Sequence, residues 1–427
     1  MILPCRLKLG TCFFVLLFSL GVPFGAGASV KFIPPEPRNI DNVDIYLLTR
    51  GAGEDIYTKY GHTMFRVVDP SQRLDVGYNW GAFDFYDPGF IVKFLRGFLL
   101  YYLDISDASR EVEVSNLEQR WLVQEHLNLT FRQKQALLMI LKRESQPERR
   151  YYRYLFFVDN CSTRPRNYID EAIGGKIAAR FQRAGSGSTF RDMVMDYNAS
   201  SPVMAMGQDV ILNSEADRPL SKWEEMFVPL KLREYLLTLP AYNDDGSTRG
   251  REKLLSDRRM LVEFPDPAVP FYNGYMIFWV IIGTPLLLGT VVALKTSLQK
   301  RGVRIFGFAL ALWGAISGFF ALYLTLSWAF SEHTVVHHNA NLWLLWPVDW
   351  YYLFLGILLM SSGTFPRQEG LLGKFTTWIT LGHLAALGIY ALLALGGFFA
   401  QDVKRVLIYF GLLALFLYGF TFRLARS

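Results

Sequence analysis

The chain has 427 residues, 51% of them hydrophobic, and its 44 Lys and Arg residues outnumber its 38 Asp and Glu residues to give a formal net charge of +6. The composition is mixed up to about residue 270 and mostly apolar and aromatic afterwards. Because the excess of positive charge lies largely beside the apolar segments, it indicates membrane topology and argues against a nucleic-acid partner.

Residues 1–28 have the features of a secretory signal peptide. Arg6 and Lys8 supply a positive start, Cys12–Val22 is apolar but too short to span a bilayer, and Ala26-Gly27-Ala28 offers a cleavage site. We therefore expect the domain that follows to be exported. The alternative is a leader that stays attached as an uncleaved anchor.

The exported domain is expected to be an α+β domain over residues 29–240, followed by a connector at 241–270. Runs of alternating apolar residues predict its strands, and Thr130 and Gln133 form a capping box that should open a helix reaching about Arg143. The strands are predicted at 43–49, 62–68, 74–80, 101–105, 111–114 and 151–158, with a helix at 90–99, a loop at 184–188 and a partly helical stretch at 216–239.

Cys161 is the only cysteine outside the leader, since Cys5 and Cys12 both lie within it. It follows the predicted strand at 151–158 and precedes a predicted helix that ends at Gly174-Gly175. The unpaired N–H groups and the dipole at a helix start favour a thiolate and can hold an oxyanion. Cys161 is therefore a candidate nucleophile. The alternatives are a buried hydrophobic cysteine and a phosphate-binding turn, although no Gly-rich loop is present.

A thiolate nucleophile usually needs a base, and the exported domain has two histidines. His62 opens a predicted strand, which is a rigid position for a general base, whereas His126 lies just before the capping box and is expected to be structural. The alternative for His62 is a hydrogen-bonded core histidine. Arg164 is expected to add positive potential and to contact the substrate. The polar residues that could orient His62 are Asp84, Asp159 and Asn160.

Five motifs occur in the order in which a known family has them. Together they resemble the Lnb N-terminal periplasmic domain family over roughly residues 40–240. The resemblance implies a permuted NlpC-like papain fold in which the histidine precedes the cysteine, with Cys161 as the nucleophile and His62 as the base. The motifs are Tyr46–Thr49, Tyr60–Thr63, Tyr78–Phe85, Asp159–Arg164 and Ala216–Pro229.

The resemblance also implies a reaction. The enzyme that gives the family its name moves an acyl chain within a bacterial lipoprotein, from the diacylglyceryl group to the N-terminal cysteine amine. The expected function is therefore a membrane-bound thiol acyltransferase with a Cys161 thioester, and the expected partner is a diacylglyceryl lipoprotein or membrane lipid. No cofactor and no metal is expected. The alternatives are a cysteine peptidase or amidase acting on cell-wall peptides, and a non-enzymatic envelope protein.

Residues 271–427 are expected to form an all-α transmembrane domain of about five helices in the inner membrane. The Lys and Arg residues at 295–304 predict a cytoplasmic loop, the loop at 331–343 has none and should lie outside, and the C-terminus should be cytoplasmic. Pro285 is expected to kink the first span. The predicted spans are 271–294, 305–330, 344–363, 375–400 and 406–422.

The outer loop and the start of the next span contain polar residues at the depth of lipid headgroups. Asn339, Asn341 and Asp349 are expected to contact the polar end of the substrate, beside the aromatic residues of 343–352. One alternative is a set of solvated interfacial residues. The other is a metal site made by His333, His337 and His338, although adjacent histidines diverge on a helix or a strand.

Overall fold

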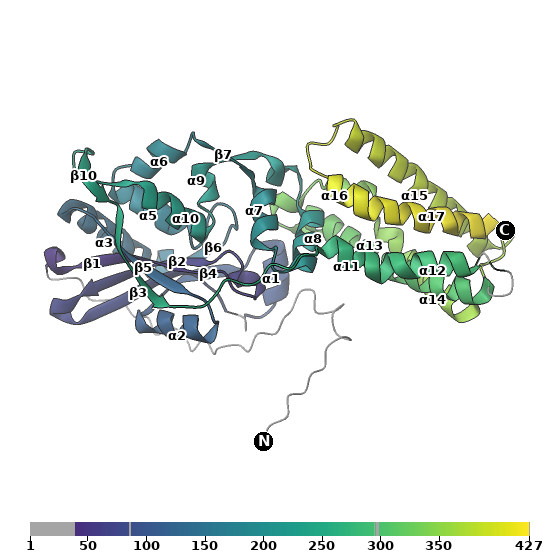
Figure 1. Ribbon diagram of the computed structural model, residues 1–427, viewed down its shortest axis with the longest axis horizontal. Coiled ribbons are helices and arrows are strands. Elements are labelled where there is room, and N and C mark those ends of the chain that lie inside the picture. Colours follow the sequence, from purple (N-terminus) through teal and green to yellow (C-terminus); the bar gives the residue numbers. More distant parts are fainter. Residues whose placement is uncertain (1–38, 85–86, 294, 296–298, 427) are drawn as a thin grey trace, which may run out of the picture. The chain divides into compact units, whose positions relative to one another are not determined.

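The computed structural model describes residues 39–84, 87–293, 295 and 299–426, so the expected signal peptide lies outside the described residues. The chain divides into two compact units (Figure 1). The first combines the part up to residue 188 with 219–268, and the second combines 189–218 with 269 onward.

A seven-stranded antiparallel sheet forms the centre of the first unit. Apolar residues alternate along its strands, so that Ile45 and Leu47 are buried on one face and Leu48 on the other. Two small sheets pair β9 (Pro240–Tyr242) with β10 (Thr248–Lys253) and β7 (Gly185–Thr189) with β8 (Pro219–Ser221). The main strands in spatial order are β11 (Leu255–Val262), β5 (Leu122–Leu127), β1 (Asp44–Arg50), β2 (His62–Asp69), β3 (Leu74–Ala82), β4 (Leu100–Asp107) and β6 (Tyr151–Arg153).

Helices cover both faces of this sheet (Figure 1). The larger core joins one face to α3 (Phe131–Glu144), α5 (Thr163–Ala172) and α10 (Pro229–Thr238), and α2 (Ser109–Leu117) packs on the other. A mixed helix and sheet domain followed by a helical region is therefore confirmed, while the permuted papain arrangement stays a prediction. The shorter helices are α1 (Phe90–Arg96), α4 (Pro147–Arg150), α6 (Lys176–Phe181) and α9 (Lys222–Glu225).

The local sequence patterns predicted some helices and strands correctly and missed others. The capping box of Thr130 and Gln133 is present at the start of α3. The strand predicted at 111–114 is wrong, because this stretch belongs to α2, which buries Glu111 and Ser115 at a spacing of four. The strand predicted at 151–158 is shorter, and the predicted loop at 184–188 contributes to β7. Neither β5 nor β11 was predicted.

The domain boundaries also differ from those expected. Residues 241–270 are more than a connector, since β11 pairs with β5 at the edge of the main sheet. Residues 189–218 belong to the helical unit, where α7 (Phe190–Tyr197) and α8 (Pro202–Ile211) lie. The reason is Asp209, which accepts from the Tyr275 hydroxyl at 2.9 Å and lies 3.3 Å from Arg405, while Arg191 binds it at 2.9 Å.

Among the residues that the structure describes, four helices of the second unit are long and apolar enough to cross a membrane, and a bent pair would make a fifth span. The first span widens into a π-helix at Trp279–Gly283, just before Pro285, whose missing N–H and bulky ring disturb the preceding turn. The four are Gly274–Ala293 (α11 and α12), Gln299–Phe330 (α13), Leu371–Leu395 (α15) and Lys404–Ala425 (α16 and α17).

The third predicted span, 344–363, is a broken segment. A bend of 60° separates Thr334–Trp343 from Pro347–Ser362. Its regular helix α14 (Trp350–Ser362) has 13 residues, or about 20 Å, against a hydrocarbon thickness of about 30 Å. The α14 helix packs closely on α13, because a Cβ atom on Gly307 would lie 2.8 Å from the carbonyl oxygen of Gly356.

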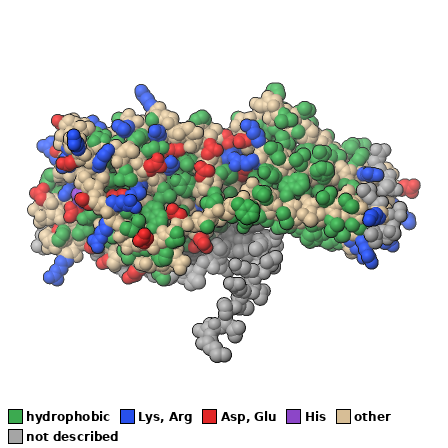
Figure 2. Space-filling model, in the orientation of Figure 1, with side chains coloured by type: hydrophobic (Ala, Val, Ile, Leu, Met, Phe, Trp, Pro, Cys, Tyr) green, Lys and Arg blue, Asp and Glu red, His purple; other side chains and the backbone are tan. Residues whose placement is uncertain are grey.

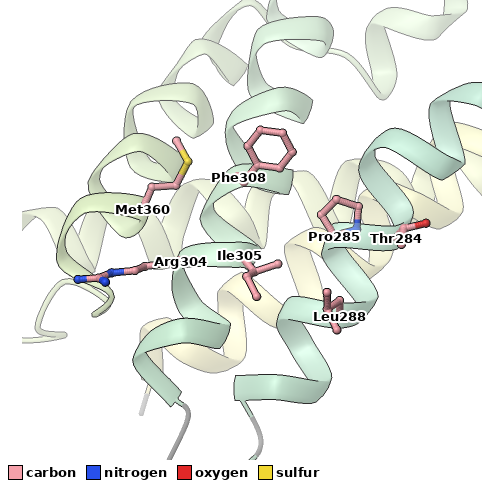
Figure 3. A pocket seen from close by; sticks show the side chains of 7 residues that line it. All are labelled: Thr284, Pro285, Leu288, Arg304, Ile305, Phe308 and Met360. Atoms are coloured by element: carbon pink, nitrogen blue, oxygen red, sulfur yellow. The ribbon is translucent and has the colours of Figure 1, made fainter. Parts of the chain in front are cut away.

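The surface of the helical unit suits a lipid environment. Hydrophobic side chains cover most of its visible face, whereas charged side chains are spread across that of the sheet-bearing unit (Figure 2). An apolar groove of about 470 Å³ lies between α12, α13 and α14 (Figure 3). Arg304 lines it together with Pro285 and Phe308. These apolar helices fit a multi-pass membrane protein.

Candidate active site

Cys161 lies in the turn that leads into α5, and only 7% of its surface is exposed. The Asn160 side chain holds this turn, because its Oδ1 accepts the N–H groups of Ser162 at 2.8 Å and Thr163 at 2.9 Å. Its Nδ2 donates to the carbonyl oxygen of Phe227 at 2.9 Å. Asn160 therefore satisfies the first donors of the helix and fixes the position of the neighbouring thiol.

The sulfur of Cys161 lies among donors and aromatic rings. The backbone N–H of Thr63 and the hydroxyl of Tyr154 both donate hydrogen bonds to it. Burial nevertheless raises the pKa of the Cys161 thiol to about 11, since loss of hydration disfavours the thiolate more than these bonds favour it. The expectation of a stabilised thiolate at the helix start is therefore wrong for the resting site, where the thiol is neutral.

His62 and Cys161 both lie beside Gly81, near the end of the β2–β3 hairpin that is opposite its turn. A Cβ atom on Gly81 would lie 3.5 Å from Cβ of Cys161 and 3.7 Å from Cε1 of His62. Gly81 has a φ of +104°, a conformation that disfavours any residue with a side chain. Glycine at this position therefore leaves space between the thiol and the imidazole.

A series of hydrogen bonds between polar side chains starts at Nε2 of the imidazole. His62 Nε2 lies 2.6 Å from Oδ1 of Asn79, and Asn79 Nδ2 donates to Glu111 Oε1 at 3.0 Å. Glu111 in turn binds Arg50 at 2.6 Å, and the side chains of both are at least 95% buried. Because Glu111 accepts from Nδ2, Asn79 presents its oxygen to His62, whose Nε2 must carry the proton. Nδ1 is then the basic nitrogen.

The protonation state of His62 follows from its surroundings. Burial, and next the positive charge of Arg50, lower the pKa of His62 to about 4. The imidazole is therefore neutral at neutral pH. A neutral thiol beside a neutral imidazole can exchange its proton during attack on a carbonyl, without a resting ion pair.

The expected orienting residues have other partners. Asp159 forms a two-pronged ion pair with Arg164, at 2.6 and 2.9 Å, and Arg164 also lies over the ring of Tyr152 and 3.6 Å from Glu144. The oxygen that faces His62 belongs to Asn79, which corrects the assignment of that role to Asp159, Asn160 or Asp84. These contacts occupy the guanidinium group of Arg164. His126 binds Asp44 and Asn128, as a structural residue would.

The expected substrate residues of the outer loop lie in the helical unit and are buried. Asn339 donates to the carbonyl oxygens of residues 210–212, and Asn341 donates to Val210 at 2.8 Å and accepts from the Tyr390 hydroxyl at 2.7 Å. Asp349 lies 2.5 Å from Nε2 of His383 and accepts from Ser317. These side chains fasten α8, α13 and α15 to the loop.

The rings of His337 and His338 lie 6.5 Å apart in an edge contact, but each has a different further partner. His337 bonds to the carbonyl oxygen of Ser331 at 2.9 Å, and His338 packs on the ring of Trp328. No three His, Cys, Asp or Glu side chains gather into a metal site in the part of the chain that the structure describes. A cavity of about 360 Å³ lies beside this loop, lined by Trp328, His338, Asn339 and Phe399 among others.

The comparisons with known proteins bear on the sheet-bearing unit. Residues 36–194 match the family model of the Lnb N-terminal periplasmic domain. This part of the chain is therefore similar to the Lnb N-terminal periplasmic domain. The match includes Cys161, His62, Asn79 and Glu111. No protein of curated function and no solved structure matches the chain.

Sequence reasoning missed Asn79, although a signal for it was present. The β2–β3 hairpin pairs Phe65 with Tyr78, and the same register places His62 opposite Gly81. Asn79 is then two residues from Gly81, so it lies on the same face of the sheet as His62 and diagonally across from it. A register drawn from the predicted hairpin would have placed an amide beside the histidine.

Proposed function

We propose that the protein is a membrane-bound thiol acyltransferase that acts on diacylglyceryl lipoproteins through a Cys161 thioester. The Lnb domain supports an enzyme of this type, and the arrangement of Cys161, His62 and Asn79 supports nucleophilic catalysis. The burial of Cys161 is the observation that favours transfer over hydrolysis. A thioester formed at a site that is 7% exposed is shielded from water until an acceptor amine arrives.

The first half-reaction transfers an acyl group to sulfur. The Cys161 sulfur attacks the ester carbonyl carbon of the diacylglyceryl group while its proton passes to Nδ1 of His62. The carbon–oxygen bond of the ester then breaks, and the departing alkoxide takes the proton from His62. The proposed donors for the oxyanion are the backbone N–H groups of Thr63 and Cys161 and the hydroxyl of Tyr154, which bond to the sulfur.

The second half-reaction frees the enzyme. The N-terminal amine of the lipoprotein attacks the thioester carbonyl, and His62 takes the proton that the amine loses. The carbon–sulfur bond breaks, and His62 returns the proton to the sulfur. The product has gained an amide and lost an ester, so no cofactor is required.

The experiment is a transfer assay with the purified protein in phospholipid vesicles. The substrate is a diacylglyceryl lipoprotein with a free N-terminal amine, and mass spectrometry of its N-terminal peptide reads the product. We expect one acyl chain to move from the glyceryl group to the amine, with the peptide mass unchanged and the fragment masses altered. Release of free fatty acid, or cleavage of cell-wall stem peptides without transfer, would overturn the proposal in favour of a hydrolase.

The proposed orientation places the sheet-bearing unit outside the inner membrane and the C-terminus in the cytoplasm. The Lys and Arg residues at 295–304, which lie just before α13 and in its first turns, support it. It requires the broken segment at 334–362 to cross the membrane. A topology reporter fused to the C-terminus should report cytoplasm, and an exterior signal there would contradict this orientation.

A further inference from the structure

An exposed hydrophobic surface surrounds α1 in the sheet-bearing unit. Ile91 is 44% exposed, Val92 58% and Phe94 46%, all within the seven residues of this helix. Tyr57, which is 54% exposed, packs on Phe83 next to it. A cluster of large apolar side chains on the surface of an exported domain indicates contact with another apolar phase.

A row of aromatic rings connects this surface to the candidate active site. Phe94 stacks on Phe90 with ring centres 6.3 Å apart, and Phe90 stacks on Phe83 at 5.7 Å. Phe83 contacts Tyr101 at 5.0 Å, and Tyr101 stacks on Tyr154 at 4.4 Å. The hydroxyl of Tyr154 donates to the sulfur of Cys161. These five rings, Phe94, Phe90, Phe83, Tyr101 and Tyr154, are the aromatic row.

Basic side chains border the exposed end of the aromatic row. The guanidinium groups of Arg96 and Arg153 lie over the ring of Phe98, at 5.1 and 4.9 Å from its centre. Both residues are exposed, and Phe98 comes after Gly97, the C-cap of α1. Apolar side chains next to cations match a lipid surface, where acyl chains lie beneath phosphate groups.

We propose that α1 lies on the bilayer surface and that the aromatic row guides an acyl chain of a membrane lipid from there to Cys161. This inference rests on the proposed function, since it supplies the route by which the acyl donor reaches the thiol. It commits to lipid as the occupant of the α1 surface, because the chain carries its own membrane-spanning helices and because the basic border complements phosphate.

The test compares two thiol reagents on the full chain in phospholipid vesicles. N-dodecylmaleimide partitions into the bilayer and carries a chain that resembles an acyl group, whereas N-ethylmaleimide is small and soluble. The readout is the rate at which the peptide containing Cys161 becomes modified, measured by mass spectrometry. The measured quantity is the ratio of the dodecyl rate to the ethyl rate, which does not depend on whether Cys161 is catalytic.

The variant is Ile91→Asp with Val92→Asp, which places two charges on the α1 surface. Its matched control is Leu117→Asp with Met139→Asp, at positions of the same unit that are 58% and 59% exposed. We expect the α1 variant to lower the dodecyl rate about tenfold or more and to change the ethyl rate by no more than about twofold, since charge opposes burial in lipid. The control should keep the wild-type ratio.

An unchanged ratio in the α1 variant, as a protein-binding role for this surface would give, would overturn the proposal, and so would an equal fall in the control. The outcome is separate from that for the proposed function. A Cys161→Ser variant that retains transfer would end the acyltransferase mechanism. The reagent ratio measured on the wild type and on the α1 variant, which both keep Cys161, would still stand.

Discussion

His62 and Asn79 are joined by a hydrogen bond of 2.6 Å between the Nε2 nitrogen and the Oδ1 oxygen. The bond selects the tautomer of His62 that carries its proton on Nε2 and leaves Nδ1 as the basic nitrogen. Asn79 also donates to Glu111, so Glu111 fixes the side chain that in turn positions His62. Asn79 is a positioning residue, and its effect on activity must act through His62.

Replacing Asn79 tests this dependence. Asn79→Ala should lower kcat about tenfold to a hundredfold, because the imidazole loses the partner that sets its tautomer. Asn79→Asp should raise the pKa of His62 above its low value, because a carboxylate favours the charged ring. The acid limb of the pH–rate profile should then move to higher pH, which a purely structural role would not produce. If the acid limb of Asn79→Asp lies at the same pH as that of the wild type, Asn79 does not act on His62.

Glu111 is expected to matter for stability as well as for activity. Glu111→Gln leaves the guanidinium of Arg50 buried without its closest carboxylate, which should cost about 3–5 kcal/mol in the free energy of unfolding. The matched change Glu113→Gln lies on the exposed side of the same helix and should cost less than about 0.5 kcal/mol. Thermal unfolding of both purified variants measures the difference. Equal melting temperatures would refute the assignment of Glu111 to a buried ion pair.

The pKa values of the site predict how its thiol responds to pH. Burial raises the pKa of Cys161 to about 11 and, with Arg50, lowers that of His62 to about 4. Between pH 6 and pH 9 the imidazole stays neutral, and the thiolate fraction grows about tenfold per pH unit. The rate of alkylation by iodoacetamide should therefore rise steadily over this range. A plateau between pH 5 and pH 7 would instead reveal a resting thiolate–imidazolium pair.

The sequence could predict the elements that depend on local patterns. Strands β1 to β3, the capping box of α3 and the turn at Cys161 all follow from alternation and turn chemistry over a few residues. The edge strand β11 could not be recognised, because Arg258 and Arg259 interrupt its apolar pattern where the edge faces solvent. The role of Asn79 depends on strand register, and the burial of Cys161 depends on how distant rings pack.

The same reasoning explains why the outer loop was given a substrate role. Asn339 and Asn341 look solvated in the sequence because they follow charged and polar residues. In the structure both are at most 3% exposed, since residues 210–212 accept hydrogen bonds from them through their carbonyl groups. Contacts between segments more than 120 residues apart leave no local signal.

Asn341 therefore gives a direct test of the outer loop. Asn341→Ala removes the acceptor of the buried Tyr390 hydroxyl and the shorter of two hydrogen bonds to the Val210 carbonyl, which should cost about 1–3 kcal/mol in the free energy of unfolding. Gln368→Ala, on an exposed loop of the same unit, should be neutral. The measurement is thermal unfolding in detergent. An Asn341→Ala protein of full stability that has lost turnover would restore the substrate-contact role.

The most direct test concerns the thioester on Cys161. Wild-type protein incubated with a diacylglyceryl lipoprotein whose N-terminal amine is blocked should gain the mass of one acyl chain, and neutral hydroxylamine should remove it. Cys161→Ser, which is nearly the same size, should fold, gain no hydroxylamine-sensitive mass and lose transfer activity by several orders of magnitude, because serine is far less acidic. Intact-mass spectrometry of both proteins decides the matter. A folded Cys161→Ser protein that still transfers the acyl chain at a near-normal rate would contradict the mechanism.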